Sequence, residues 1–197
     1  GYYGFIEKLA SLTGAIEDLD DLESAIEKRL RDFIKEGTCA SDIALQSAYP
    51  VADRAAANEV FKCARSGKAV SEAESETFKG YLTYFLMKLY AKYGIRTEIH
   101  VGAMRNNNSV MLEKLGLDTG YDSIAEDDGI KYLSRLFDRL NNENALPKTI
   151  LFNLNPKMNT EIMTLIGCFQ SDEARGKIQY GPAWWVLDNK VGMEKHL

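Results

Sequence analysis

The chain has 197 residues, 45% of them hydrophobic and 27% charged, with a formal net charge of −5. These values are typical of a globular domain with a substantial core. The acidic balance and the lack of a dense Lys/Arg stripe disfavour a nucleic-acid partner, and no apolar run approaches the ~20 residues of a membrane span. The three widely spaced cysteines favour reduced thiols in a cytoplasmic location over disulfides or a structural zinc site.

Residues 1–94 are predicted to be mainly helical. A first helical pattern ends at Gly37, and residues 39–45 then form a short apolar run around Asp42. This run is either a strand that carries Asp42 or a turn that Asp42 caps. Further helices are expected at residues 52–65 and from the Ser71–Glu74 capping box to Gly94.

Residues 95–197 are predicted to alternate between strands and helices. The expected strands lie at residues 97–101, 149–154 and 177–180, and helical sequence follows each of them. Such units form right-handed parallel βαβ connections. The α/β pattern fits consecutive βα units from the middle of a (β/α)₈ TIM barrel, since the chain is shorter than the ~250 residues of a full barrel.

Polar and aromatic residues follow the predicted strands, where parallel sheets bind ligands. They are His100, Arg105 and the Asn106–Asn108 run after the first strand, Asn153 and Asn155 after the second, and Tyr180, Trp184 and Trp185 after the third. Arginine pairs with carboxylates, and amides and indole N–H groups bind hydroxyls. This set predicts a polar, anionic small-molecule ligand. The residues alone leave open that His100 is a satisfied core residue and that the two tryptophans only pack.

A metal site is not predicted within this chain. A catalytic zinc ion needs three protein ligands, and the chain has two histidines, His100 and His196, far apart in sequence. Any further ligands would have to come from sequence outside the chain.

Five segments resemble the uronate (glucuronate) isomerase family. They are residues 98–108 (EIHVGAMRNNN), 117–123 (LDTGYDS), 146–156 (LPKTILFNLNP), 166–170 (IGCFQ) and 176–192 (GKIQYGPAWWVLDNKVG). The resemblance extends more loosely over the helical first half. The RNNN and WW segments are its most specific parts.

The resemblance implies a metal-dependent barrel of the amidohydrolase superfamily that interconverts D-glucuronate and D-fructuronate, and D-galacturonate and D-tagaturonate. It implies a divalent metal, zinc first, whose His-x-His and terminal Asp ligands do not lie in this sequence. By resemblance, His100 is the candidate catalytic residue near the metal. The candidate substrate-binding residues are Asp42, Arg105, Asn107, Trp184 and Trp185.

The sequence departs from the family pattern at one position. Family members usually have Ser-Asp-His where this chain has Ser41-Asp42-Ile43. The missing histidine would face the active site, so either the alignment slips at this position or this member is altered at its site.

The chain is therefore expected to be an internal fragment of a uronate isomerase, inactive by itself. Exposed sheet edges predict a homo-oligomer. The alternative is a non-catalytic uronate- or carbohydrate-binding module on a barrel arc. A hydrolase of the same superfamily is disfavoured by the RNNN and WW segments.

Overall fold

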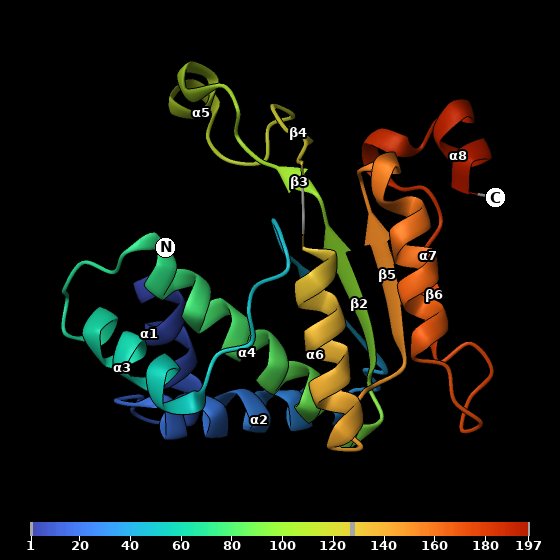
Figure 1. Ribbon diagram of the computed structural model, residues 1–197. Coiled ribbons are helices and arrows are strands. Elements are labelled where there is room, and N and C mark those ends of the chain that lie inside the picture. The colour runs from blue at the N-terminus through green and yellow to red at the C-terminus, as the bar shows by residue number, and fades with distance from the viewer. Residues whose placement is uncertain (1, 127–128, 197) are drawn as a thin grey trace.

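The computed structural model describes residues 2–126 and 129–196; residues 1, 127–128 and 197 lie outside the described part (Figure 1). The elements in chain order are α1 (Tyr2–Thr13), α2 (Leu19–Lys35), β1 (Ala40–Ala44), α3 (Arg54–Arg65), α4 (Glu72–Tyr93), β2 (Arg96–Val101), β3 (Ala103–Met104), α5 (Ser109–Leu115), β4 (Ser123–Ile124), α6 (Ile130–Asn142), β5 (Thr149–Asn153), η1 (Pro156–Met158), α7 (Asn159–Cys168), β6 (Ile178–Tyr180), η2 (Trp185–Leu187) and α8 (Lys190–His196). The helix-rich first half and the strand–helix alternation after it are both present. Within the described part, no helix is long and apolar enough to span a membrane.

The central sheet has four strands in the order β1-β2-β5-β6, and every pair is parallel. The predicted α/β class is therefore confirmed. The run around Asp42 is the edge strand β1, so Asp42 lies in a strand and does not cap a turn. Because β1 pairs with β2, the one strand of the helix-rich half belongs to the same sheet as the strands that follow it.

The two faces of the sheet differ. In β2, Thr97, Ile99 and Val101 are buried, whereas Glu98 and His100 on the opposite face are only half-buried. Adjacent side chains of a strand point to opposite faces, and the register aligns His100 with Phe152 of β5. The buried face packs against the helices, with α6 and α7 running alongside it in Figure 1.

Helix α4 begins and ends as the sequence predicts. Ser71 and Glu74 form a capping box, and Gly94 ends the helix in the left-handed conformation. Among the α4 side chains, Tyr81, Tyr84 and Met87 are more buried than Phe78 or Leu82. Burial of the two tyrosines leaves neither hydroxyl unsatisfied, since Tyr81 donates to Glu23 and Tyr84 to Glu143.

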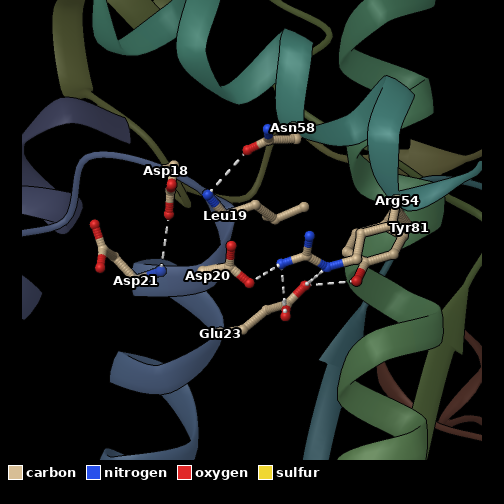
Figure 2. Close-up of polar contacts among 8 residues, drawn as sticks. All are labelled: Asp18, Leu19, Asp20, Asp21, Glu23, Arg54, Asn58 and Tyr81. Atoms are coloured by element: carbon tan, nitrogen blue, oxygen red, sulfur yellow. Dashed lines mark hydrogen bonds and ion pairs between the residues drawn. The ribbon is translucent and has the colours of Figure 1, made fainter.

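A polar cluster joins helices α2, α3 and α4 (Figure 2). Arg54, the first residue of α3, contacts Asp20 at 2.6 Å and Glu23 at 3.1 Å, and Tyr81 of α4 donates to the same Glu23. Burial raises the pKa of the Tyr81 hydroxyl, so it remains a donor at neutral pH. In the same view, Leu19 donates its backbone N–H to Asn58 at 3.1 Å, which adds a second link between α2 and α3.

A second link between α2 and α4 predicts a specific loss of stability in acid. Hydrogen bonds from Lys92 and Tyr93, and a weaker one from Arg31, lower the pKa of Glu27 from 4.5 to about 2. A depressed carboxyl pKa contributes stability that is full above the ordinary value and is lost as the pH falls from about 4.5 towards 2. We expect wild type to exceed Glu27→Gln by about 1 kcal/mol in unfolding free energy near neutral pH, since solvent screens this partly exposed group. Urea unfolding at pH 6 and pH 3 should show the difference shrink; a constant difference would contradict it.

Candidate functional site

His100 and Asp42 meet across the first two strands of the sheet. Ala44 of β1 is the register partner of His100, so Asp42 lies on the same face, two residues earlier. The Nδ1 atom of His100 is 2.6 Å from Oδ1 of Asp42, and their side chains are 13% and 60% exposed. Because a carboxylate only accepts hydrogen bonds, this contact assigns the proton to Nδ1 and leaves Nε2 of a neutral ring as a proton acceptor.

Two aromatic rings enclose the imidazole of His100. Phe152 stacks on it with ring centroids 4.4 Å apart and an angle of 8° between the planes. Trp184 approaches edge-on, also with centroids 4.4 Å apart. The predicted residues Asp42, His100 and Trp184 are thus brought together. Phe152 was not predicted from the sequence, because the pairing of β2 with β5 is what brings it to His100.

The tryptophan pair extends the cluster to Arg105. The rings of Trp184 and Trp185 lie 5.6 Å apart, and the Arg105 guanidinium lies 5.0 Å from the centroid of the Trp185 ring. The buried Nε1 atom of Trp184 has no hydrogen-bond partner in the part of the chain that the structure describes. A buried indole N–H without a protein acceptor is a candidate donor to a ligand oxygen.

Arg105 is also held by two acids of the segment between α5 and β4. Its Nη1 atom is 3.2 Å from Asp118 and 3.7 Å from Asp122. The Asp122 side chain is only 6% exposed and accepts the backbone N–H of Asn106 at 2.7 Å. An anionic ligand at Arg105 would therefore share the guanidinium with these carboxylates.

Asn107 points away from His100, into the arm formed by β3, α5 and β4. Its Nδ2 atom donates to the carbonyl oxygens of Met104 at 2.7 Å and Tyr121 at 3.2 Å. β3 and β4 pair antiparallel, and α5 lies beyond them, away from the main body (Figure 1). No strand was predicted here from the sequence, so this small sheet was not expected. Asn107 therefore holds the arm together through these hydrogen bonds. The structure does not bring it to the other candidate residues.

The side chains of Asn153, Asn155 and Tyr180 also form hydrogen bonds with other groups of the protein. Asn153 and Asn155 are buried and bond to neighbouring backbone atoms. Tyr180 donates to Asn159 at 2.6 Å and stacks on His196, whose Nε2 atom lies 3.2 Å from the Tyr180 hydroxyl. His196, for which no role was expected, thus ties α8 to the end of β6.

A pocket of about 340 Å³ lies beside this cluster, and His100, Arg105 and Trp184 line it. Lys79 of α4 and Tyr49 line it as well, and the Lys79 ammonium lies 5.1 Å from the Tyr49 ring centroid. Neither residue was predicted from the sequence, because an exposed lysine on a helix and a single tyrosine in a loop carry no signal of their own. The pocket combines two cations with aromatic walls, which suits an anionic, hydroxyl-bearing molecule.

The expectation that position 43 faces the active site is wrong for this chain. β1 alternates between its two faces, and Ile43 packs against the core clusters on the helix-covered face while Asp42 points the other way to His100. The period of two in a strand puts neighbouring side chains on opposite faces. Having isoleucine in place of histidine at this position therefore does not remove a side chain from the His100 cluster.

A metal ion finds few ligands in this chain. Within residues 2–126 and 129–196, no group of three or more His, Cys, Asp or Glu side chains is placed to hold one. Asp42 and His100 offer two groups, which already bond to each other. A three-ligand catalytic site does not fit on the described residues alone.

Comparison with protein families and curated relatives gives one consistent result. The family described as glucuronate isomerase matches residues 1–197. The uronate isomerase of Caldanaerobacter subterraneus subsp. tengcongensis is 43% identical over 198 residues, which cover 100% of this chain and 42% of that protein. The uronate isomerase of Clostridium perfringens is 38% identical over 199 residues, covering 100% of this chain and 43% of the relative. The chain thus spans well under half the length of these curated relatives.

Solved structures agree with this result. The uronate isomerase of Thermotoga maritima superposes with a TM-score of 0.89 at 26% identity, covering 100% of this chain and 42% of that one. The glucuronate isomerase of Caulobacter crescentus gives a TM-score of 0.85 at 26% identity, covering 97% of this chain and 39% of that one. The likeness therefore includes the arrangement of the elements as well as the sequence.

Proposed function

Because the chain belongs to the glucuronate isomerase family, we propose that it supplies one part of a uronate isomerase. The proposed reactions are the interconversions of D-glucuronate with D-fructuronate and of D-galacturonate with D-tagaturonate. The observation that carries the proposal is the Asp42–His100 pair at 2.6 Å, at the carboxyl end of parallel strands and beside a pocket with aromatic walls. The three cysteines of the chain are free in the described residues, which is consistent with the proposed cytoplasmic location.

The proposed architecture of the whole protein is a (β/α)₈ barrel of the amidohydrolase superfamily. Three findings support it. The central sheet has four strands, half of a barrel of eight, and all of them are parallel. The chain covers 42% of a curated relative. The sheet face opposite the helices carries the half-buried residues Glu98, His100, Ile150 and Phe152, as the inner wall of a barrel does.

The proposed chemistry moves one proton between two carbons. With Nδ1–H held by Asp42, Nε2 of His100 takes the proton from C2 of the aldose, and the C–H electrons form the C1–C2 double bond of an enediolate. The hydroxyl proton on O2 moves to O1. The imidazolium then returns its proton to C1, which leaves a ketone at C2. The Asp42 carboxylate stabilises the imidazolium between the two transfers, as an acid beside a histidine base does.

The remaining candidates are proposed to bind the substrate. The unpartnered Trp184 N–H is available to a hydroxyl or carboxylate oxygen, and Arg105 faces the pocket as a cation for the uronate carboxylate. Trp185 supports Arg105 through its ring. Asp42, being largely exposed, has a second oxygen for a substrate hydroxyl. Asn107 contributes by holding the arm that carries Arg105.

A divalent metal, zinc first, is proposed for the full-length protein, with ligands outside this chain. The described residues do not form a three-ligand site, so no step above is assigned to the metal. The chain alone is proposed to be inactive. Homo-oligomerisation is proposed from the edge of β1, whose outer side pairs with no strand among the described residues.

The alternative is a non-catalytic uronate-binding module, in which the pocket and its cations would bind the uronate without converting it. Titration of the chain with D-glucuronate, followed by tryptophan fluorescence, addresses it directly because both tryptophans of the chain lie in the cluster. Binding by the chain alone in the presence of a chelator would favour the module. No binding without the rest of the barrel would favour the isomerase.

A chimera tests the proposed function itself. The 197 residues replace the matching segment of the Caldanaerobacter relative, which is 43% identical over that segment. We expect the chimera to convert D-glucuronate to the ketose, measured by NMR of the sugar. The isolated chain is the control and is expected to show no turnover. A folded chimera that binds the uronate without converting it would refute the isomerase proposal.

A further inference from the structure

We propose that Phe152 and Gly181 are positioning residues for His100, acting as one unit across the sheet. The inference rests on the proposed function for the meaning of His100, but its geometry is independent of any activity. Neither residue belongs to the candidate set derived from the sequence. Phe152 sets the plane of the imidazole, and Gly181 supplies the room that Phe152 needs.

The unit is a row of neighbouring residues across three strands. His100 of β2 is the register partner of Phe152 of β5. Gly181 follows Tyr180, the register partner of Leu151, and donates its backbone N–H to the Leu151 carbonyl at 2.7 Å. Gly181 therefore lies on the side of Phe152 away from His100, and the Phe152 ring occupies the space between them.

Gly181 is needed for space and not for backbone conformation. Its φ lies outside the left-handed range, so another residue could adopt it. A Cβ atom at this position, however, would lie 2.4 Å from Cδ1 and 2.5 Å from Cε1 of Phe152. An alanine methyl would thus overlap the ring and push it towards the imidazole stacked on its other side.

The contact with Asp42 is not enough to orient His100. The hydrogen bond fixes one ring atom, but the Asp42 side chain is 60% exposed, and water competes for an exposed carboxylate. The ring remains free to turn about that bond unless its faces are held. The parallel stack on Phe152 at 8° holds one face and fixes the plane, and the Trp184 ring packs beside the imidazole at 70° to it. Together the three contacts set the direction of Nε2.

The state of the imidazole in the whole 197-residue chain tests the proposal without an activity assay. Long-range ¹H–¹⁵N NMR at a pH where the ring is neutral reports which nitrogen carries the proton. With two histidines in the chain, His196→Gln assigns the signals. In wild type we expect His100 protonated on Nδ1 alone. In Phe152→Leu and in Gly181→Ala we expect a mixture of Nδ1- and Nε2-protonated His100, because the imidazole is no longer held against Asp42.

The double variant separates coupling from two unrelated defects. In Phe152→Leu/Gly181→Ala there is no aromatic ring to displace, so its His100 signals should match those of Phe152→Leu alone. Gly167→Ala is the matched control: a Cβ there meets no atom within 4 Å, and its His100 signals should equal those of wild type. Single Nδ1 protonation in Phe152→Leu, or additive changes in the double variant, would overturn the inference. If Gly181→Ala does not fold, Phe152→Leu decides alone.

The chimera adds a kinetic readout that distinguishes this inference from the proposed function. Phe152→Leu should lower kcat about 10- to 100-fold with little change in KM, as misplacement of a catalytic group does. An inactive parent chimera would count against the isomerase proposal and leave the NMR result to decide the inference. An active parent with an unchanged kcat in Phe152→Leu would count against the positioning role.

Discussion

Replacing His100 with alanine in the chimera is expected to lower kcat for D-glucuronate by about 1,000-fold, the usual contribution of a general base. Nε2 of the imidazole can accept a proton, because Nδ1 is bound to Asp42, whereas the unpartnered indole N–H of Trp184 can only donate. Its loss removes the group that carries the proton from C2 to C1. KM should change little, because the proposed substrate contacts come from other residues. Steady-state kinetics and hydrogen–deuterium exchange at C2 measure the effect.

Asp42→Asn separates proton transfer from ring orientation. The amide keeps the size of the carboxylate but can donate a proton to Nδ1, and it does not stabilise an imidazolium. We expect a decrease in kcat of roughly 10- to 100-fold, smaller than that of His100→Ala. Asp172→Asn, an exposed acid distant in sequence from the cluster, is the matched control and should retain full activity. If His100→Ala keeps wild-type kcat, His100 is not the base.

Much of the fold follows from signals that are local in sequence. The capping box at Ser71, the left-handed Gly94 and the apolar run around Leu151 each act within one element, and each predicted its element correctly. The side of α4 that is buried was less predictable. The helix packs against β2, α3 and α6, so the side chains it buries depend on the neighbours and not on its own periodicity. The short β3–β4 pair left no signal, since each strand has only two residues.

The site was predictable where strand ends determine it and unpredictable where register does. His100 lies near the end of one predicted strand and Trp184 follows another, and the parallel sheet brings them together. Phe152 needs the pairing of β2 with β5, which no single segment reveals. At position 43 the motif match predicted the wrong face of the strand. The match placed this side chain in the site, whereas the pleat of β1 directs it towards the core.

Replacing Gly80 with alanine is expected to destabilise the protein by about 3 kcal/mol, against the usual trend for a helix interior. An alanine normally stabilises a helix by about 0.5–1 kcal/mol relative to glycine. At position 80, however, a Cβ would lie 1.9 Å from the carbonyl oxygen and 2.9 Å from the carbonyl carbon of Pro50. Both are backbone atoms, so no side-chain rotation relieves the overlap. Either α4 or the segment after β1 must move.

This close approach connects the stability of α4 to the site. Tyr49 and Lys79, the neighbours of Pro50 and Gly80, both line the pocket beside His100. Gly80→Ala should therefore lower the melting temperature by about 6–12 °C for a chain of this size and also weaken uronate binding. Differential scanning calorimetry measures the first effect and tryptophan fluorescence the second. Gly167→Ala, which meets no neighbouring atom, should raise stability slightly. Equal melting temperatures for the two variants would show that α4 does not approach Pro50 as closely as described.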